Sequence, residues 1–125
     1  MPIDFPPIKS KIFQASAANE DTIATLRLMG TADASVHALV QQAVTVMREQ
    51  ARVLQVSEVA VDMRELEFMN SSCFKCFITW LSDLLEQPLE QRYRIRFLSD
   101  PSKHWQHRSL RALSCFAVDL VSIEA

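Results

Sequence analysis

Residues 59–77 constrain the fold most, because a β-strand pattern there passes directly into an α-helix pattern. Val59, Val61 and Met63 form a short β-rich run, and apolar character returns at residues 66–69. Helical spacing of apolar residues then starts after Cys73, at Phe74, Phe77, Ile78, Leu81, Leu84 and Leu85. The segment predicts a buried strand, a short loop and an amphipathic helix.

The segment Asn70-Ser71-Ser72 lies between this strand and this helix, and its residue types are strong helix caps. A helix N-terminus presents unpaired backbone N–H groups and the positive end of the helix dipole. We therefore expect any chemistry of the chain to take place at this corner. As caps alone, Asn70 and Ser71 would each stabilise the helix by roughly 1 kcal/mol and do nothing more.

The length, net charge and glycine count of the sequence narrow the possible classes of protein. Its 125 residues predict one domain, 1–125, with an extended N-terminal segment at 1–7 that holds three prolines. The net charge of −2 argues against a nucleic-acid partner. A single glycine, Gly30, excludes the glycine-rich loops that bind phosphates in nucleotide-binding proteins.

The sequence has no recognisable targeting signal, so we expect a cytoplasmic protein. No apolar run approaches the roughly 20 residues that cross a bilayer, and the N-terminus has no signal-peptide pattern. Three cysteines, an odd number, fit a reducing compartment better than a disulfide framework. We expect no membrane insertion and no cofactor.

The remaining segments alternate between strand and helix patterns. Strands are expected at 8–14, 22–29, 93–98 and 116–123, helices at 35–53 and 105–113, and a turn at 15–21. Asp33 or Ser35 caps the first helix. The order predicts an α/β fold with a mixed four- to five-stranded sheet and three to four helices mainly on one face.

Three local motifs, in this order, resemble the STAS domain of anti-sigma factor antagonists. Residues 26–33 look like the family's strand-Gly-x-x-Asp motif, and residues 61–72 are similar to its core strand and Asp-Ser-Ser/Thr-Gly loop. Residues 110–118 resemble its closing helix and last strand. The resemblance covers about residues 22–123, and a divergent member is expected because Asn70 stands in place of Asp and Cys73 in place of Gly.

The resemblance implies a non-enzymatic regulatory module that a serine phosphate switches. By motif position Ser71 is the phosphoacceptor, with Ser72 next, and Asp33 lies close to it. The same loop and the first turn of its helix, with Asn70, Cys73, Phe74 and Lys75, form the expected partner surface. The implied partners are a bacterial anti-sigma factor or serine-kinase-like protein and a phosphatase. The question of a homodimer stays open.

Two alternatives to this switch are retained. A constitutive docking subunit of an ATPase in a transport or signalling assembly would have the same fold without the phosphate. A thiol redox protein would use Cys73 and Cys76, a Cys-x-x-Cys pair at a helix start, where the dipole lowers a thiol pKa.

Other chemistry finds less support in the sequence. The segment 104–108, with two histidines, Trp105 and Arg108, is either a docking or anion-binding patch or a helix with only Trp105 turned inward. His104 and His107 are three residues apart, but no third ligand lies nearby, so we expect no metal site. A Gly-x-Ser-x-Gly nucleophile motif is absent, which argues against a hydrolase.

Overall fold

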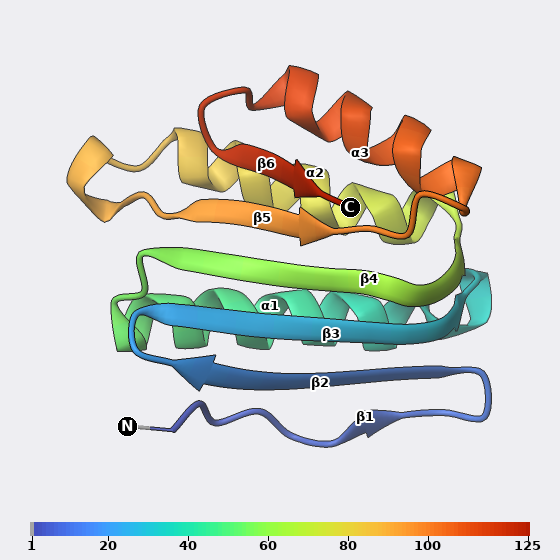
Figure 1. The fold of residues 1–125 in the computed structure, drawn as a ribbon. Coiled ribbons are helices and arrows are strands. Elements are labelled where there is room, and N and C mark those ends of the chain that lie inside the picture. The colour runs from blue at the N-terminus through green and yellow to red at the C-terminus, as the bar shows by residue number, and fades with distance from the viewer. Residues whose placement is uncertain (1) are drawn as a thin grey trace.

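The computed structural model describes residues 2–125, which form one six-stranded sheet and three α-helices (Figure 1). The strands are β1 (Ile8–Lys9), β2 (Phe13–Glu20), β3 (Ile23–Ala32), β4 (Glu58–Met69), β5 (Arg94–Leu98) and β6 (Val121–Glu124). The helices are α1 (His37–Leu54), α2 (Ser71–Leu85) and α3 (His104–Phe116), with 3-10 turns η1 (Ala34–Val36) and η2 (Leu89–Gln91). The predicted α/β fold is confirmed, with one strand more than expected.

The sheet is mixed, and its strands lie side by side in the order of the sequence. β1, β2 and β3 are antiparallel neighbours, whereas β3, β4, β5 and β6 run parallel. Each parallel connection contains one α-helix, as parallel strands require a crossover. The carboxyl ends of the four parallel strands and the N-termini of the three helices therefore meet at one edge of the sheet, on the right of Figure 1.

The expected turn at 15–21 is wrong, because most of it belongs to β2. Ala15 pairs with Leu28 and Ala17 with Leu26, so the hairpin turns only at Asp21, whose φ is 54°. The residues Ala15-Ser16-Ala17-Ala18 have low intrinsic β-propensity, which is why the sequence pattern indicates a turn. In-register pairing with β3 over the whole strand outweighs that local preference.

The strand expected at 116–123 is shorter than predicted, since only Val121–Glu124 is extended. Phe116 is the last residue of α3, and the Ala117 N–H continues the helical bonding to the Leu113 carbonyl at 3.0 Å. Phe116 and Val118 are exposed whereas Ala117 and Leu120 are buried, so the first part of the apolar run that looks like a strand is a turn after the helix.

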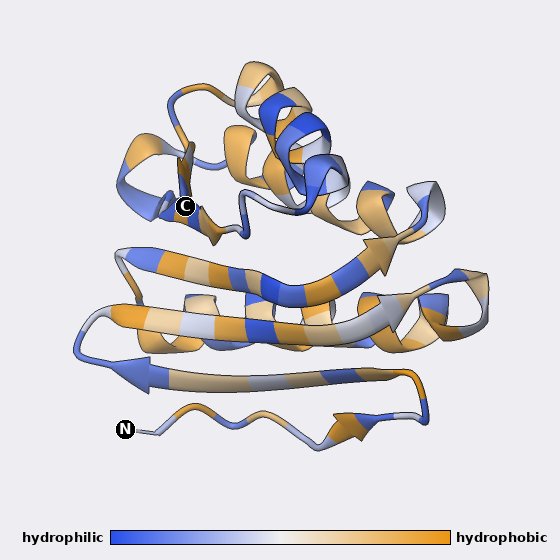
Figure 2. Cartoon of the chain, turned by 45° about the vertical axis from the view of Figure 1, so that its right-hand side comes forward, coloured by the Kyte–Doolittle hydropathy of each residue, from blue (hydrophilic) through white to orange (hydrophobic). Residues whose placement is uncertain are grey.

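One hydrophobic core fills the space between the sheet and the helices. Alternate residues of β3 and β4, such as Leu26 and Val61, are fully buried and pair across the two strands. α1 and α2 lie behind the sheet in Figure 1, and α3 lies along the β6 side. In the first part of β3, hydrophobic and hydrophilic residues alternate (Figure 2), whereas residues 59–63 of β4 are all buried. Within the described residues, no helix is both long and apolar enough to span a bilayer.

β4 is the longest strand, and its second half carries two irregularities. The register against β3 shifts between Arg27 and Met29 and again between Gly30 and Thr31, each time with an additional residue on β4. The expected loop after Met63 is therefore extended chain that continues to Met69. β5 stops opposite Asp62, so beyond that point β4 has a strand partner on only one side.

Candidate functional site

The predicted corner is the direct junction of β4 and α2, with Asn70 alone between them. The Asn70 side-chain oxygen accepts hydrogen bonds from the Cys73 N–H and the Ser72 hydroxyl, both at 3.0 Å. The Asn70 N–H donates to the Ala32 carbonyl at 2.9 Å, which joins the corner to the end of β3. Asn70 is therefore the helix cap that the sequence predicts.

The two serines of the corner differ in accessibility. Ser71 is exposed, and its hydroxyl makes no hydrogen bond with the described residues. Ser72 is half-buried, and its hydroxyl donates to Asn70. Ser71 is the first residue of α2, so its side chain lies beside N–H groups that have no partner inside the helix.

Asp33 lies beside this corner from the other connection. Its carboxylate accepts hydrogen bonds from the backbone N–H and the hydroxyl of Ser35 and so caps η1. Its backbone carbonyl accepts a long hydrogen bond of 3.6 Å from the Cys73 thiol. Asp33, in the connection between β3 and α1, is thus in contact with Cys73 in the first turn of α2.

The remaining residues of the predicted surface separate into exposed and buried ones. Lys75 is exposed and Phe74 is half-buried against the core. Cys73 is completely buried, so its side chain is unavailable to a partner, in contrast to the expectation. Cys73 is two residues after Ser71 in α2, and its side chain faces the core.

The thiols of α2 have an environment that opposes redox chemistry. Burial raises the pKa of the Cys73 thiol, and burial also raises that of Cys76. A raised pKa favours the neutral thiol, and the thiolate is the form that reacts. Cys76 is 4.0 Å from the His37 ring, and Cys73 is fully covered. The structure therefore gives no support to the redox alternative.

Sequence reasoning missed a groove between α1 and α2 next to the corner. It has a volume of about 240 Å³, and Ser72, Lys75 and Thr79 line it from α2. His37 and Gln41 line it from α1. The polar positions of two amphipathic helices indicate a solvent face, but only the pairing of those helices in space makes a groove.

Phe68 was also missed as a surface residue. It is 46% exposed at the end of β4, two residues before the helix cap. Leu66 is fully buried although it stands only two positions earlier, where strand alternation predicts the same face. The additional β4 residue between the pairs Gly30–Leu66 and Thr31–Phe68 reverses the alternation and turns Phe68 outward.

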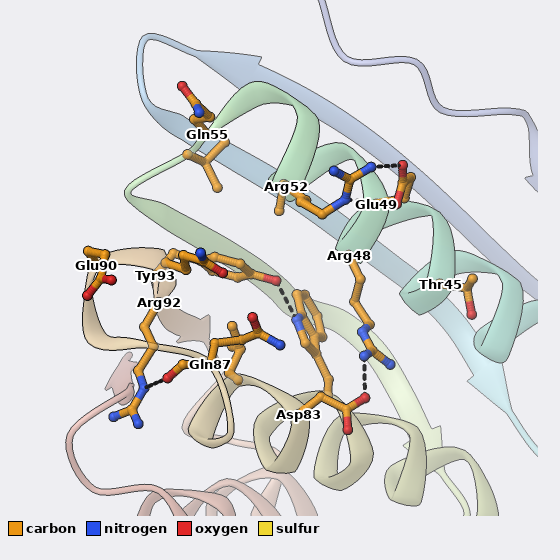
Figure 3. Close-up of a pocket in the computed structure, with 15 residues that line it drawn as sticks. Thr45, Arg48, Glu49, Arg52, Gln55, Asp83, Gln87, Glu90, Arg92 and Tyr93 are labelled. Carbon is orange, nitrogen blue, oxygen red and sulfur yellow. Dashed lines mark hydrogen bonds and ion pairs between the residues drawn. The ribbon is translucent and has the colours of Figure 1, made fainter.

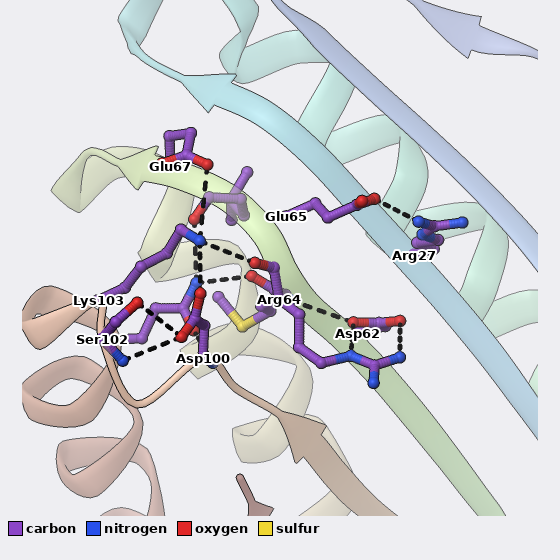
Figure 4. A network of polar contacts seen from close by, with 11 residues as sticks. Arg27, Asp62, Arg64, Glu65, Glu67, Asp100, Ser102 and Lys103 are labelled. Carbon is purple, nitrogen blue, oxygen red and sulfur yellow. Dashed lines mark hydrogen bonds and ion pairs between the residues drawn. The ribbon is translucent and has the colours of Figure 1, made fainter.

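A network of polar contacts supports the second half of β4 (Figure 4). Lys103 donates to the Arg64 carbonyl at 2.9 Å and pairs with Asp100 at 2.8 Å. The hydrogen bond from Lys103, followed by bonds from Ser102, lowers the pKa of the Asp100 carboxyl to about 2. The guanidinium of Arg64 bonds both oxygens of Asp62 and lowers the pKa of that carboxyl. These contacts are structural, since each cation already has its anion.

A larger cavity lies at the opposite end of the helices, near the start of β5 (Figure 3). It has a volume of about 1030 Å³, with Trp80 and Tyr93 among its lining residues. Arg48 pairs with Asp83 beside it, and Arg92 donates to the Leu85 and Gln87 carbonyls at the end of α2. Arg48 and Arg92 therefore already have partners within the protein. The cavity lies at the other end of α2 from Ser71.

Comparison with solved structures identifies the class of fold. A scan of family models and a search of curated proteins match nothing to this chain. The chain has the fold of anti-sigma factor antagonists, the STAS fold, as the resemblance implies.

Two particular structures carry this assignment. One is an anti-sigma factor antagonist from Mycobacterium paratuberculosis, with a TM-score of 0.64 and 12% identity over 90% of this chain and 85% of that one. The other is the anti-sigma factor antagonist SpoIIAA in its unphosphorylated form, with a TM-score of 0.55 and 15% identity over 90% of this chain and 88% of that one. At these identities the likeness establishes the architecture.

Proposed function

We propose that this chain is a non-enzymatic regulatory module that binds a protein partner through the β4–α2 corner and is switched by phosphorylation of Ser71. The observation that carries the proposal is the exposed, unbonded hydroxyl of Ser71 at the first position of α2. The neighbouring Ser72 is the second choice, because it is half-buried and bonded to Asn70. The matched SpoIIAA structure is that protein's unphosphorylated form, which supports a search for a phosphorylated form of this chain.

A phosphate at Ser71 would alter the surface and leave the fold intact. It adds about −1.5 to −2 charges at neutral pH. The free N–H groups and the dipole of the helix N-terminus favour an anion at this place. Asp33 and its η1 turn lie nearby and add negative charge. An acidic partner surface that fits the unmodified corner would then be repelled.

The proposed partner surface has three parts in addition to Ser71. Phe68 supplies an exposed aromatic side chain, and Lys75 supplies a positive charge on the same helix as Ser71. The groove between α1 and α2 adds His37 and Gln41. Exposed aromatic side chains are frequent in binding hot spots. The partner would be an anti-sigma factor or serine-kinase-like protein, with a phosphatase to reverse the modification.

Two measurements test the phosphorylation switch. Intact-mass and peptide mass spectrometry of the protein from its own cells should show one added phosphate on Ser71, which phosphatase treatment removes. Partner binding should be weaker for Ser71→Asp than for Ser71→Ala, while Ser72→Ala binds like the parent protein. Equal partner binding of parent, Ser71→Asp and Ser71→Ala would contradict the proposal.

A constitutive docking subunit of an ATPase assembly is the second candidate. Asn70 favours it, since the corner has a neutral amide where the family carries a carboxylate, with Cys73 buried behind it. In that case the partner co-purifies with the chain under all growth conditions, no phosphate is found, and Phe68→Ala still weakens binding.

A further inference from the structure

The outer side of α3 is a positively charged surface without carboxylates. The exposed residues of α3 are His104, His107, Arg108, Arg111, Ala112, Cys115 and Phe116. The opposite side of the helix is buried through Gln106, Leu110 and Leu113. α3 itself contains two arginines, Arg108 and Arg111, and no Asp or Glu, in a chain whose net charge is −2. In Figure 2 hydrophilic residues gather on the turns of α3 that face the viewer.

The two arginines of this surface differ from most other arginines of the chain. Arg27, Arg48, Arg52, Arg64 and Arg96 each pair with a carboxylate. Among residues 2–125, neither Arg108 nor Arg111 has an ion pair or a hydrogen bond from its guanidinium. They are three residues apart, so their side chains lie on one face of the helix, about 5–6 Å apart at Cβ. Two free guanidinium groups at this spacing match two carboxylates one helical turn apart.

Apolar side chains border the charged surface at the end of α3. Phe116 is 48% exposed and Val118 is 72% exposed. Trp105 is half-buried, and helical spacing places residues 105, 112 and 116 along one flank of the helix. A strip of cations beside exposed aromatic and aliphatic side chains is the composition of a protein-binding surface, which favours Trp, Phe and Arg.

We propose that the α3 surface, defined as Arg108, Arg111, Phe116 and Val118, binds an acidic amphipathic segment of a partner protein. The carboxylates of that segment would meet the two guanidinium groups, and its apolar side chains would cover Phe116 and Val118. The surface contains none of the corner residues, so it is a second docking site that stands or fails independently of the switch at Ser71.

The size of the charged surface favours a peptide over a lipid or a nucleic acid. Attraction to an anionic membrane grows with the number of Lys and Arg side chains near the surface, and two arginines alone hold a protein there only weakly. Nucleic-acid binding depends on many simultaneous phosphate contacts. A short acidic segment needs only two charge-assisted, bidentate pairs together with apolar contact, which this surface offers.

The test uses the full chain and a defined probe. A fluorescein-labelled helical peptide of about 15 residues, with Glu on one face and Leu on the other, is titrated with the protein and followed by anisotropy. A matched peptide has Gln for every Glu. The variants are Arg108→Glu/Arg111→Glu, Phe116→Ala and the control Lys9→Glu/Lys11→Glu, which makes the same charge change at exposed residues of the β1 region. Circular dichroism checks that each variant is folded. If the charge-reversal variant Arg108→Glu/Arg111→Glu is unfolded, Arg108→Gln/Arg111→Gln is used in its place.

The expected result is binding of the Glu peptide that weakens by about tenfold or more in the arginine variant and severalfold in Phe116→Ala. The Lys9→Glu/Lys11→Glu control should stay within about twofold of the parent, because the charges lie elsewhere. The proposal is overturned if the Gln peptide binds equally, if both double variants lose equal affinity, or if no peptide binds below about 1 mM. It is also overturned if phosphatidylglycerol vesicles, and not the peptide, show the arginine dependence, since the occupant would then be a lipid surface.

Discussion

The side-chain amide of Gln106 donates a hydrogen bond of 2.6 Å to the backbone carbonyl of Met63. It donates a second, of 3.0 Å, to the Leu66 carbonyl, and its oxygen accepts from the Asp100 N–H at 2.9 Å. Gln106 is completely buried. β5 ends before this part of β4, so the glutamine takes the hydrogen-bonding positions that a longer β5 would occupy.

Replacement of Gln106 by Leu should therefore be strongly destabilising. Two carbonyls and one N–H would lose their hydrogen-bond partners. Each such group lowers the free energy of unfolding by about 1–3 kcal/mol before the structure relaxes. We expect a total loss on the order of 3 kcal/mol in the free energy of unfolding, measured by urea denaturation. Gln42→Leu on the exposed side of α1 is the control and should change stability by less than about 0.5 kcal/mol. Similar losses for both variants would contradict this role of Gln106.

The helix cap predicts different outcomes for two substitutions of Asn70. Asn70→Ala removes the acceptor of the Cys73 N–H and should cost about 1 kcal/mol in unfolding free energy. Asn70→Asp keeps that acceptor and adds a negative charge at the positive end of the α2 dipole, so stability should be equal to or above that of the parent. Thermal unfolding of the three proteins side by side makes the comparison. If Asp destabilises as much as Ala does, the cap is not the reason for this residue.

Gly30 is the chain's one glycine, and its backbone requires that residue. Its φ is +93°, and a β-carbon there would collide with the Ile12 carbonyl oxygen across the β2–β3 hairpin. Gly30→Ala should thus destabilise the protein by more than about 2 kcal/mol, through both the left-handed backbone and the clash. Ser16→Ala at an exposed position of β2 is the control. Equal urea midpoints for the two variants would exclude the clash.

Tyr93 gives a pH dependence with a direct spectroscopic readout, because it is the chain's single tyrosine. Burial raises the pKa of its hydroxyl above the ordinary 10.0. The folded protein thus holds the Tyr93 proton more tightly than the unfolded chain does. The contribution of the protonated hydroxyl to the free energy of unfolding is therefore complete below pH 10 and is lost as the pH rises through the folded-state pKa. Tyrosinate absorbance should appear at higher pH in the native protein than in urea. Coincident titration curves would show that the ring is not buried.

The same residue carries a buried hydrogen bond. The Trp80 indole N–H donates to the Tyr93 oxygen at 2.7 Å, and both side chains lie in the core. Tyr93→Phe leaves that N–H without a partner and should lower the unfolding free energy by about 1–3 kcal/mol. A loss well below this range would indicate that water replaces the hydroxyl at the adjoining cavity.

The corner was predictable because its signals are local. A β-rich run, a cap triplet and helical spacing are read within about 20 residues, and the observed cap bond from Cys73 to Asn70 follows from them. The contact between Asp33 and Cys73 in the first turn of α2 follows once the strand order is known, since parallel strands bring their carboxyl ends to the same end of the sheet.

The parts that the sequence did not predict depend on pairing between distant segments. β2 consists largely of small residues whose extended form depends on β3, and the outward Phe68 depends on a register shift between β3 and β4. The burial of Gln106 depends on where β5 stops. A polar residue in a helix is normally on the side that faces solvent. Gln106 is buried because β5 ends early and leaves the β4 carbonyls of Met63 and Leu66 for its side chain to bond.

The order of the strands has a consequence for how the chain folds. Because every strand pairs with its neighbour in the sequence, no pairing has to wait for a distant part of the chain. Each loop that must close spans one hairpin or one helix, which keeps the entropic cost of every closure small. The sheet can therefore grow from its N-terminal hairpin strand by strand while the polypeptide is still being synthesised, with β6 completing the edge last.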